Sequence, residues 1–171
     1  MKKSALALFA AHERFALKVA YGIAEEEATA RSPLGSNSPV WQIGHLAAVN
    51  NSILLMLGGK SAIPTNYGPL FGPGSKPDHA TTYPRFASVV VSYREVHKYA
   101  TQAFTAAGEA ALNAPFSKHP LASLFPTVGE FITFLMTTHE VYHLTQLNEW
   151  RRQMGRPVLD PVMSMLDAER I

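Results

Sequence analysis

Two histidines near the C-terminal end of the sequence are spaced for metal binding. His139 and His143 stand four residues apart in the segment THEVYHLTQL. On a helix, side chains at this spacing lie on one face with Cβ atoms about 6 Å apart, so both imidazoles could reach one ion. Apolar residues continue this face at helical steps in both directions: Val128, Ile132, Leu135, Met136, Leu147 and Trp150. The pair is therefore predicted to face the protein interior.

A third histidine on another apolar segment completes a set of metal ligands. His45 lies in the segment VWQIGHLA, and Gly44 beside it leaves room for a neighbouring helix or a ligand. Three neutral imidazoles leave coordination positions open for water or substrate, which is typical of a reactive site rather than a closed structural one. The sequence thus predicts a site made by His45, His139 and His143.

Other side chains beside these histidines are candidates for a supporting role. Trp41 and Tyr142 are expected either to line the pocket or to pack in the core. Gln146 either forms a hydrogen bond with a metal ligand or a bound water, or is partly exposed to solvent. The sequence assigns no general acid or base, because the direction of Glu140 depends on the rotation of its helix.

The remaining four histidines have simpler interpretations. His12 and His97 occur on apolar helical faces and are predicted to be hydrogen-bonded core residues. His79 and His119 lie near prolines in predicted loops and are predicted to be solvated.

The composition excludes several function classes. The chain of 171 residues has no cysteine, which excludes disulfides, a cysteine nucleophile, iron–sulfur ligation and thiolate zinc sites. Hydrophobic residues make up 47% and charged residues 16%, so the chain is not intrinsically disordered. With 15 Lys and Arg against 13 Asp and Glu, and no basic cluster, nucleic-acid binding is not expected.

Four segments with helical periodicity would position the histidines: roughly residues 3–27, 38–59, 82–108 and 127–152. Ser38 and Pro39 suit a helix start, and Thr127 with Glu130 form a capping-box pattern. A long segment, 61–81, is rich in proline and glycine and is predicted to be a crossover that lets its flanking helices run parallel. The prediction is an all-α fold: one domain over 1–171, a four-helix bundle with one long crossover loop between helices 2 and 3.

The sequence also bears on localisation. The N-terminal residues MKKSALALFAA look like a short signal peptide, but the apolar stretch is short and the helical pattern continues without a break. No apolar run approaches the roughly 18 residues that span a bilayer. We therefore expect a soluble cytoplasmic protein without membrane contacts.

These motifs, taken in order, resemble the DinB-like (YfiT-like) superfamily of metal-binding four-helix bundles. The resemblance covers nearly the whole chain and rests on three segments: WQIGHL at 41–46, LFGPG at 70–74, and HEVYHLTQL at 139–147, followed by Arg151, Arg152 and Gly155. It implies that His45, His139 and His143 ligate one divalent metal, usually nickel or zinc, in a bundle that often forms homodimers. Thr145 departs from the small glycine found in many relatives, which leaves the ligands in place.

The resemblance also implies a choice of chemistries. Some relatives transfer low-molecular-weight thiols such as bacillithiol or mycothiol to electrophiles or use such a thiol to isomerise a substrate, and others are described as hydrolases. An open metal site can lower the pKa of a bound thiol or of water. We expect a transferase or hydrolase acting on a small-molecule substrate, and the alternative is a non-catalytic stress-response protein that binds a metal or small ligand.

Two further interpretations compete with these. His139, Glu140 and His143 match the metalloprotease pattern His-Glu-x-x-His, but only 28 residues follow to supply a third ligand, and no strand is predicted to hold a peptide. In the other interpretation, the histidines of the bundle only form hydrogen bonds with one another.

Overall fold

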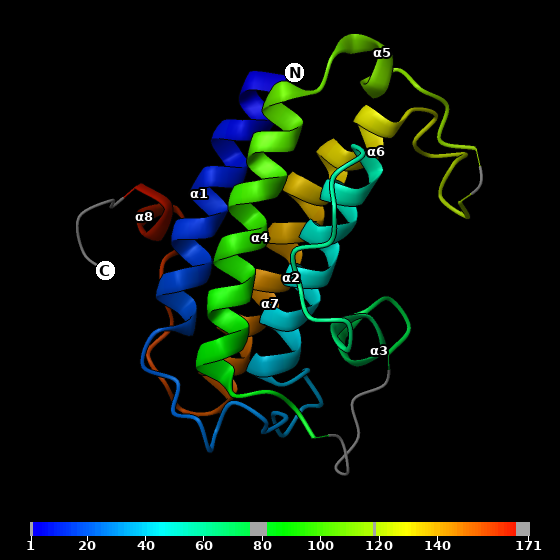
Figure 1. The fold of residues 1–171 in the computed structure, drawn as a ribbon. Coiled ribbons are helices and arrows are strands. Elements are labelled where there is room, and N and C mark those ends of the chain that lie inside the picture. The colour runs from blue at the N-terminus through cyan, green and yellow to red at the C-terminus, as the bar shows by residue number, and fades with distance from the viewer. Residues whose placement is uncertain (1, 76–81, 118, 167–171) are drawn as a thin grey trace.

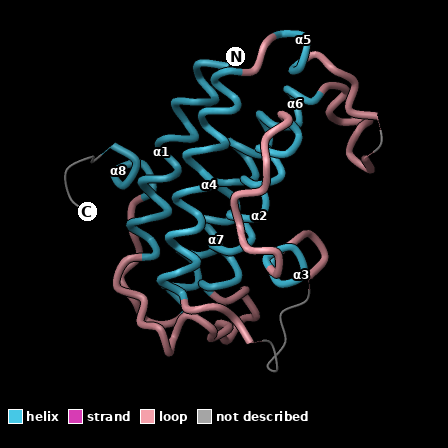
Figure 2. The backbone as a smooth tube through the Cα atoms, viewed as in Figure 1, coloured by secondary structure: helices cyan, strands magenta, loops and turns pink. Residues whose placement is uncertain are grey.

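The computed structural model describes residues 2–75, 82–117 and 119–166, and the described chain is built from helices and loops without a strand (Figures 1 and 2). The helices are α1 (Lys2–Ala20), α2 (Pro39–Met56), α3 (Tyr67–Phe71), α4 (Phe86–Ala106), α5 (Glu109–Leu112), α6 (Val128–Phe134), the π-helix η1 (Leu135–His139), α7 (Glu140–Gln153) and α8 (Pro161–Leu166). The predicted all-α fold is confirmed. His79, predicted to be solvated, lies outside the described residues.

The four long helical segments lie side by side, with α6, η1 and α7 forming the last of them (Figure 1). The helices α2 and α4 run in the same direction, and α1 and α7 run in the opposite one. The parallel pair is connected by the predicted crossover, which contains the short helix α3. Because α3 packs against α2, the crossover brings backbone groups next to His45.

The first helix is shorter than the sequence predicts, because α1 ends at Ala20 instead of continuing to residue 27. Gly22 adopts a φ of +73°, a left-handed conformation that stops the helix. The apolar pattern continues past this point, since Ile23 and Ala28 are buried, but both lie in the loop that follows α1.

The predicted helix starts are present. Thr127 and Glu130 form a complete capping box, in which the Thr127 hydroxyl accepts from the Glu130 N–H and the Glu130 carboxylate accepts from the Thr127 N–H. Ser38 and Pro39 occupy the N-cap and first position of α2, although the Ser38 side chain makes no capping bond.

The last long segment contains a π-helical turn that the sequence pattern did not predict. Residues Leu135–His139 form η1, in which the N–H of Glu140 donates to the backbone oxygen of Leu135, five residues earlier. Such a turn is wider than an α-helical one and is frequent at functional sites. The two C-terminal histidines of the candidate site thus lie on either side of the junction between η1 and α7.

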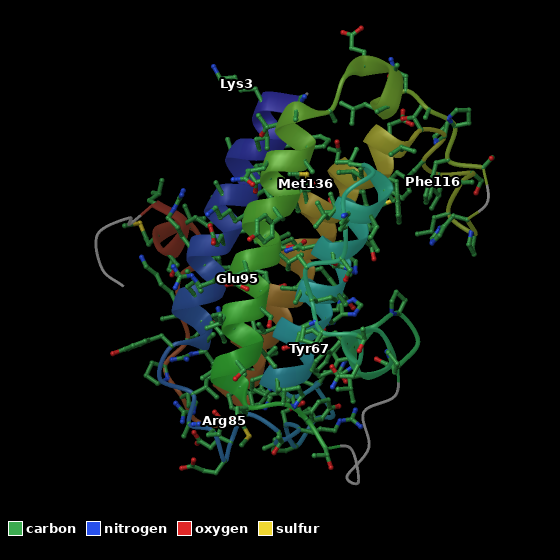
Figure 3. The ribbon with its side chains drawn as sticks, in the orientation of Figure 1. Lys3, Tyr67, Arg85, Glu95, Phe116 and Met136 are labelled. Atoms are coloured by element: carbon green, nitrogen blue, oxygen red, sulfur yellow. The ribbon has the colours of Figure 1, made fainter. Side chains whose placement is uncertain are left out.

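The interior is filled by two groups of buried apolar side chains, one toward each end of the bundle. One includes Phe15, Tyr93 and Trp150, and the other includes Phe104 and Met136. Met136 is labelled in Figure 3. Burying a side chain of this kind stabilises the fold by about 1.5–3 kcal/mol. Across the described residues, no helix is both long enough and apolar enough to cross a membrane.

Candidate metal centre

The three histidines singled out from the sequence come together inside the bundle. His45 comes from α2, His139 is the last residue of η1, and His143 belongs to α7. One ring nitrogen of each lies within 4.8 Å of the others. The Nε2 atoms of His45 and His139 are 3.4 Å apart. Two nitrogens that each bind one ion at roughly 2.0–2.1 Å, as in a Zn–N bond, are at most about 4.2 Å apart. The pair at 3.4 Å fits a shared ion as it stands, and any pair near the 4.8 Å limit must close by about half an ångström.

The ring of His45 is held by the crossover. Its Nδ1 donates to the backbone oxygen of Phe71 at 2.7 Å, which leaves the lone pair on Nε2 directed toward His139. The indole of Trp41 stacks on the ring with centroids 4.8 Å apart and planes within 6° of parallel. The Trp41 Nε1–H donates to Ser75 Oγ at 3.0 Å, so Trp41 joins the site to the crossover.

Gly44 makes this arrangement sterically possible. A Cβ at this position would lie 2.5 Å from the ring of Phe71. The space beside Gly44, which the sequence assigned to a neighbouring helix or a ligand, is thus filled by Phe71 of the short helix α3. The close approach of α3 to α2 is what lets the Phe71 carbonyl reach His45.

The ring of His143 is held by a chain of two glutamines. Its Nδ1 donates to Gln42 Oε1 at 2.7 Å, and Gln42 Nε2 donates to Gln146 Oε1 at 3.0 Å. Gln146 therefore supports a candidate ligand through Gln42 rather than contacting it directly. Sequence reasoning assigned no role to Gln42, although its position three residues before His45 places the two on one face of α2.

His139 is held less tightly than the other two rings. Its Nδ1 is buried and has no hydrogen-bond partner among the described residues. The π-turn that carries it is tied to α1, where His12 Nδ1 donates to the backbone oxygen of Met136 at 3.2 Å. His12 thus stabilises the irregular backbone beside the site.

The protonation states of the three rings suit metal binding. Burial lowers the pKa of His45, lowers that of His139 to about 4 and lowers that of His143 to about 3. All three imidazoles are therefore neutral at pH 7, which is the form that ligates a metal. In His45 and His143, the hydrogen bond at Nδ1 fixes the tautomer that presents Nε2 to an ion.

Glu140 points into the core and away from a catalytic position. Its side chain is fully buried, and Oε1 accepts a hydrogen bond from the Tyr93 hydroxyl at 2.6 Å. Burial raises the pKa of Glu140 to about 8. The carboxyl is thus mainly protonated at neutral pH, which does not suit the general base of a His-Glu-x-x-His protease.

The other aromatic and histidine residues fall into distinct places. Tyr142 is 56% exposed and touches the His143 ring edge-on, so it flanks the site from the solvent side. His97 is buried, as the sequence predicts, and its Nε2 donates to the backbone oxygen of Phe9 at 3.2 Å. His119 is exposed in the loop before α6.

A cavity of about 580 Å³ leads to the histidines from outside the bundle. His45 and His139 form part of its wall, together with residues of α2, of the loop that holds Phe116, and of the segment formed by α6 and η1. Figure 3 labels Phe116 in this loop, beside α6. A small molecule in the cavity would reach the histidine cluster directly.

A comparison with protein families agrees with this architecture. A model of the DinB superfamily matches residues 8–147, which include all three histidines. No curated protein matches the chain.

Proposed function

The chain belongs to the DinB superfamily, and we propose that it is a metal-dependent enzyme. In this proposal, His45, His139 and His143 hold one divalent ion, nickel or zinc, and the enzyme activates a low-molecular-weight thiol or water for attack on a small molecule. Three imidazoles suit both metals.

One observation carries the proposal: three neutral imidazoles converge, and the hydrogen bonds from Nδ1 leave Nε2 of two of them for an ion. Without an ion, the buried rings lose solvation and gain little in return, because the Nε2 contact between His45 and His139 is long, at 3.4 Å. An ion would satisfy the converging nitrogens. Histidines that merely bond one another would not need this geometry.

The residues around the site have separate roles in this proposal. A divalent ion in this position would lower the pKa of a bound thiol or water and so supply the nucleophile at neutral pH. Phe71 and Gln42 orient two of the ligands through their oxygen atoms, and Trp41 covers the face of His45. The cavity admits the molecule to be attacked. Because the chain has no cysteine, any thiol enters as a substrate.

Elemental analysis of the purified protein tests the metal centre. We expect about one equivalent of nickel or zinc, a loss of this metal in His139→Ala and in His143→Ala, and full retention in His119→Phe, which removes an exposed histidine outside the cluster. Full occupancy in both alanine variants would refute the ligand assignment.

A turnover screen then separates an enzyme from a protein that only binds metal or a small ligand. The metal-loaded protein is supplied with thiols plus epoxides or chlorinated aromatics, and separately with esters and amides. Turnover that requires both metal and His139 supports the enzyme. Stoichiometric metal without turnover on any of these substrates would favour the non-catalytic alternative. The homodimer suggested by the family resemblance stays a prediction, which the mass in solution tests.

A further inference from the structure

The cavity that leads to the candidate metal centre has an apolar lining with few polar groups. Most of the side chains that form it are apolar or aromatic, among them Phe116, Phe131 and Phe134. Its polar side chains are His45 and His139 at the inner end, Ser52 on α2 and His119 on the loop before α6. None of the described residues in the wall is Lys, Arg, Asp or Glu.

This lining selects a class of ligand. Along the wall away from the histidines, an anion such as a carboxylate or phosphate would lose its hydration and meet no Lys or Arg side chain that compensates for it. A flat apolar body would instead replace water along the phenylalanine rings. A volume of about 580 Å³ lies within the range of small-molecule sites and accommodates a substituted aromatic ring.

The ring of His119 lines the cavity and carries a hydrogen-bond donor. Its Nδ1 accepts from the backbone N–H of Leu121 at 3.2 Å, so the ring proton of the neutral form is on Nε2. The ring packs at 5.0 Å from both Phe116 and Phe131, which fixes its plane against the aromatic wall. His119, which sequence reasoning treated as an ordinary solvated loop residue, therefore belongs to the wall of the cavity.

We propose that the substrate of this centre is an uncharged molecule with an aromatic body, which the phenylalanine-lined cavity holds against His45 and His139 while the Nε2–H of His119 donates a hydrogen bond to a polar substituent. This inference rests on the proposed function, because it identifies the histidine cluster as the reacting end of the cavity. The aromatic recognition itself does not require the metal.

Binding to the metal-free protein tests the inference separately from the metal centre. Three probes with similar bodies are titrated in EDTA at pH 8 and followed by ¹⁹F NMR: 4-fluorobenzyl alcohol, 4-fluorotoluene and 4-fluorophenylacetate. We expect the two neutral probes to bind and the carboxylate to bind at least about tenfold more weakly than the alcohol. Failure of the neutral probes to bind, or equal binding of the carboxylate, would overturn the substrate class.

Two variants of Ser52 show whether the probes occupy this cavity. Ser52 is exposed on α2 and lines the cavity wall. Ser52→Phe adds a ring to the cavity and should abolish binding of both neutral probes, whereas Ser52→Ala should retain it. Unchanged binding in Ser52→Phe, with a melting temperature equal to that of Ser52→Ala, would place the probes elsewhere and refute the inference.

Two variants of His119 test the hydrogen bond. His119→Phe keeps an aromatic ring against Phe116 and Phe131 but removes the donor, so affinity for the alcohol should fall about three- to tenfold and affinity for 4-fluorotoluene should not change. His119→Gln restores a donor and should recover part of the loss. An equal loss for both probes would assign His119 a merely structural role.

The outcomes distinguish this inference from the proposed function. If the protein binds the neutral probes but takes up no metal, the aromatic binding site is supported and the proposed metal-dependent activity is refuted. If the protein takes up metal on the three histidines but binds none of the probes, the metal centre is supported and the proposed substrate class is refuted.

Discussion

Gln42 on α2 accepts a hydrogen bond from Nδ1 of His143 on α7 at 2.7 Å, and this bond fixes the ring nitrogen that His143 presents to the centre of the bundle. The same amide donates to Gln146, so its orientation is fixed in turn. Partners of this kind set both the tautomer and the direction of a metal-ligating histidine.

Replacing Gln42 should weaken metal binding without removing a ligand. Gln42→Met keeps a similar volume at this fully buried position but cannot accept the His143 proton. We expect metal affinity to fall about 10- to 100-fold, measured by competition with a chromophoric chelator. Gln146→Ala, one bond further from the ring, should have a smaller effect. Equal affinities in wild type and Gln42→Met would contradict this role.

Adding an alanine side chain at Gly44 should damage the site, even though alanine favours helices by about 1 kcal/mol. The new Cβ would press on the Phe71 ring, which must move together with the carbonyl that holds His45. We expect a net loss of about 1–2 kcal/mol in unfolding free energy and weaker metal binding, measured by urea denaturation and chelator competition. Gly68→Ala in α3 is the matched control, because its Cβ would meet nothing within 4 Å.

Metal should stabilise the folded protein. A ligand that binds only the native state at 100 times its dissociation constant adds about 2.7 kcal/mol, so zinc or nickel should raise the melting temperature and EDTA should reverse the rise. His143→Ala should lose this response and His119→Phe should keep it. If neither metal nor chelator changes the melting temperature, the result would support the alternative in which the histidines only form hydrogen bonds with one another.

Acid should destabilise the protein partly through His97. Burial lowers the pKa of His97 to about 4 from an ordinary value of 6.5. Between pH 6.5 and 4 the unfolded state binds a proton at His97 more readily than the folded state does. The free energy of unfolding should therefore fall by up to about 3 kcal/mol as the pH drops from 6.5 toward 4, with no contribution from His97 to the pH dependence above 6.5. The groups that face it are Glu13, His12 and Tyr93. Burial raises the pKa of Glu13, which opposes the effect in the same pH range.

His97→Gln isolates this contribution, since glutamine can still donate to the Phe9 backbone oxygen but does not titrate. Urea unfolding in EDTA between pH 4 and 7 should show a shallower dependence of stability on pH in the variant than in wild type. Parallel curves for the two proteins would show that His97 does not carry the acid sensitivity.

Arg151 should be far more important for stability than its neighbour Arg152. Its buried guanidinium donates to the backbone oxygens of Val19 and Tyr21, at the C-terminal end of α1. Arg151→Met leaves these carbonyls without a cation, and we expect a loss of about 2–4 kcal/mol in unfolding free energy. Arg152→Met removes an exposed ion pair and should cost less than about 1 kcal/mol. Similar losses would contradict the capping role.

The sequence predicted those parts of the fold whose signals are local. Side-chain caps such as Thr127 with Glu130, and apolar faces of period 3.6, act within a few residues, and they identified the four long helical segments. The length of the crossover was enough to predict that α2 and α4 run parallel. The predicted end of α1 lay seven residues too far along the chain, because apolar residues such as Ile23 continue past the turn at Gly22.

The candidate site was predictable in its histidines and not in what orients them. The spacing of His139 and His143 and the apolar residues around His45 can be read from the sequence alone. The carbonyl of Phe71 was not, because a backbone atom of a loop carries no signature of its partner. The π-turn likewise depends on tertiary contacts such as that between His12 and Met136, which no local pattern encodes.

The bond between His45 and the Phe71 carbonyl has a consequence for how the protein folds. The site joins residues 26 positions apart through this bond and 94 apart through the contact of His45 with His139. Contacts so distant along the chain close large loops and form slowly. No two helical segments that follow one another along the chain contain the whole cluster. During refolding, the capacity to take up metal should therefore emerge only after helix content has recovered, with the docking of α3 and α7 onto α2.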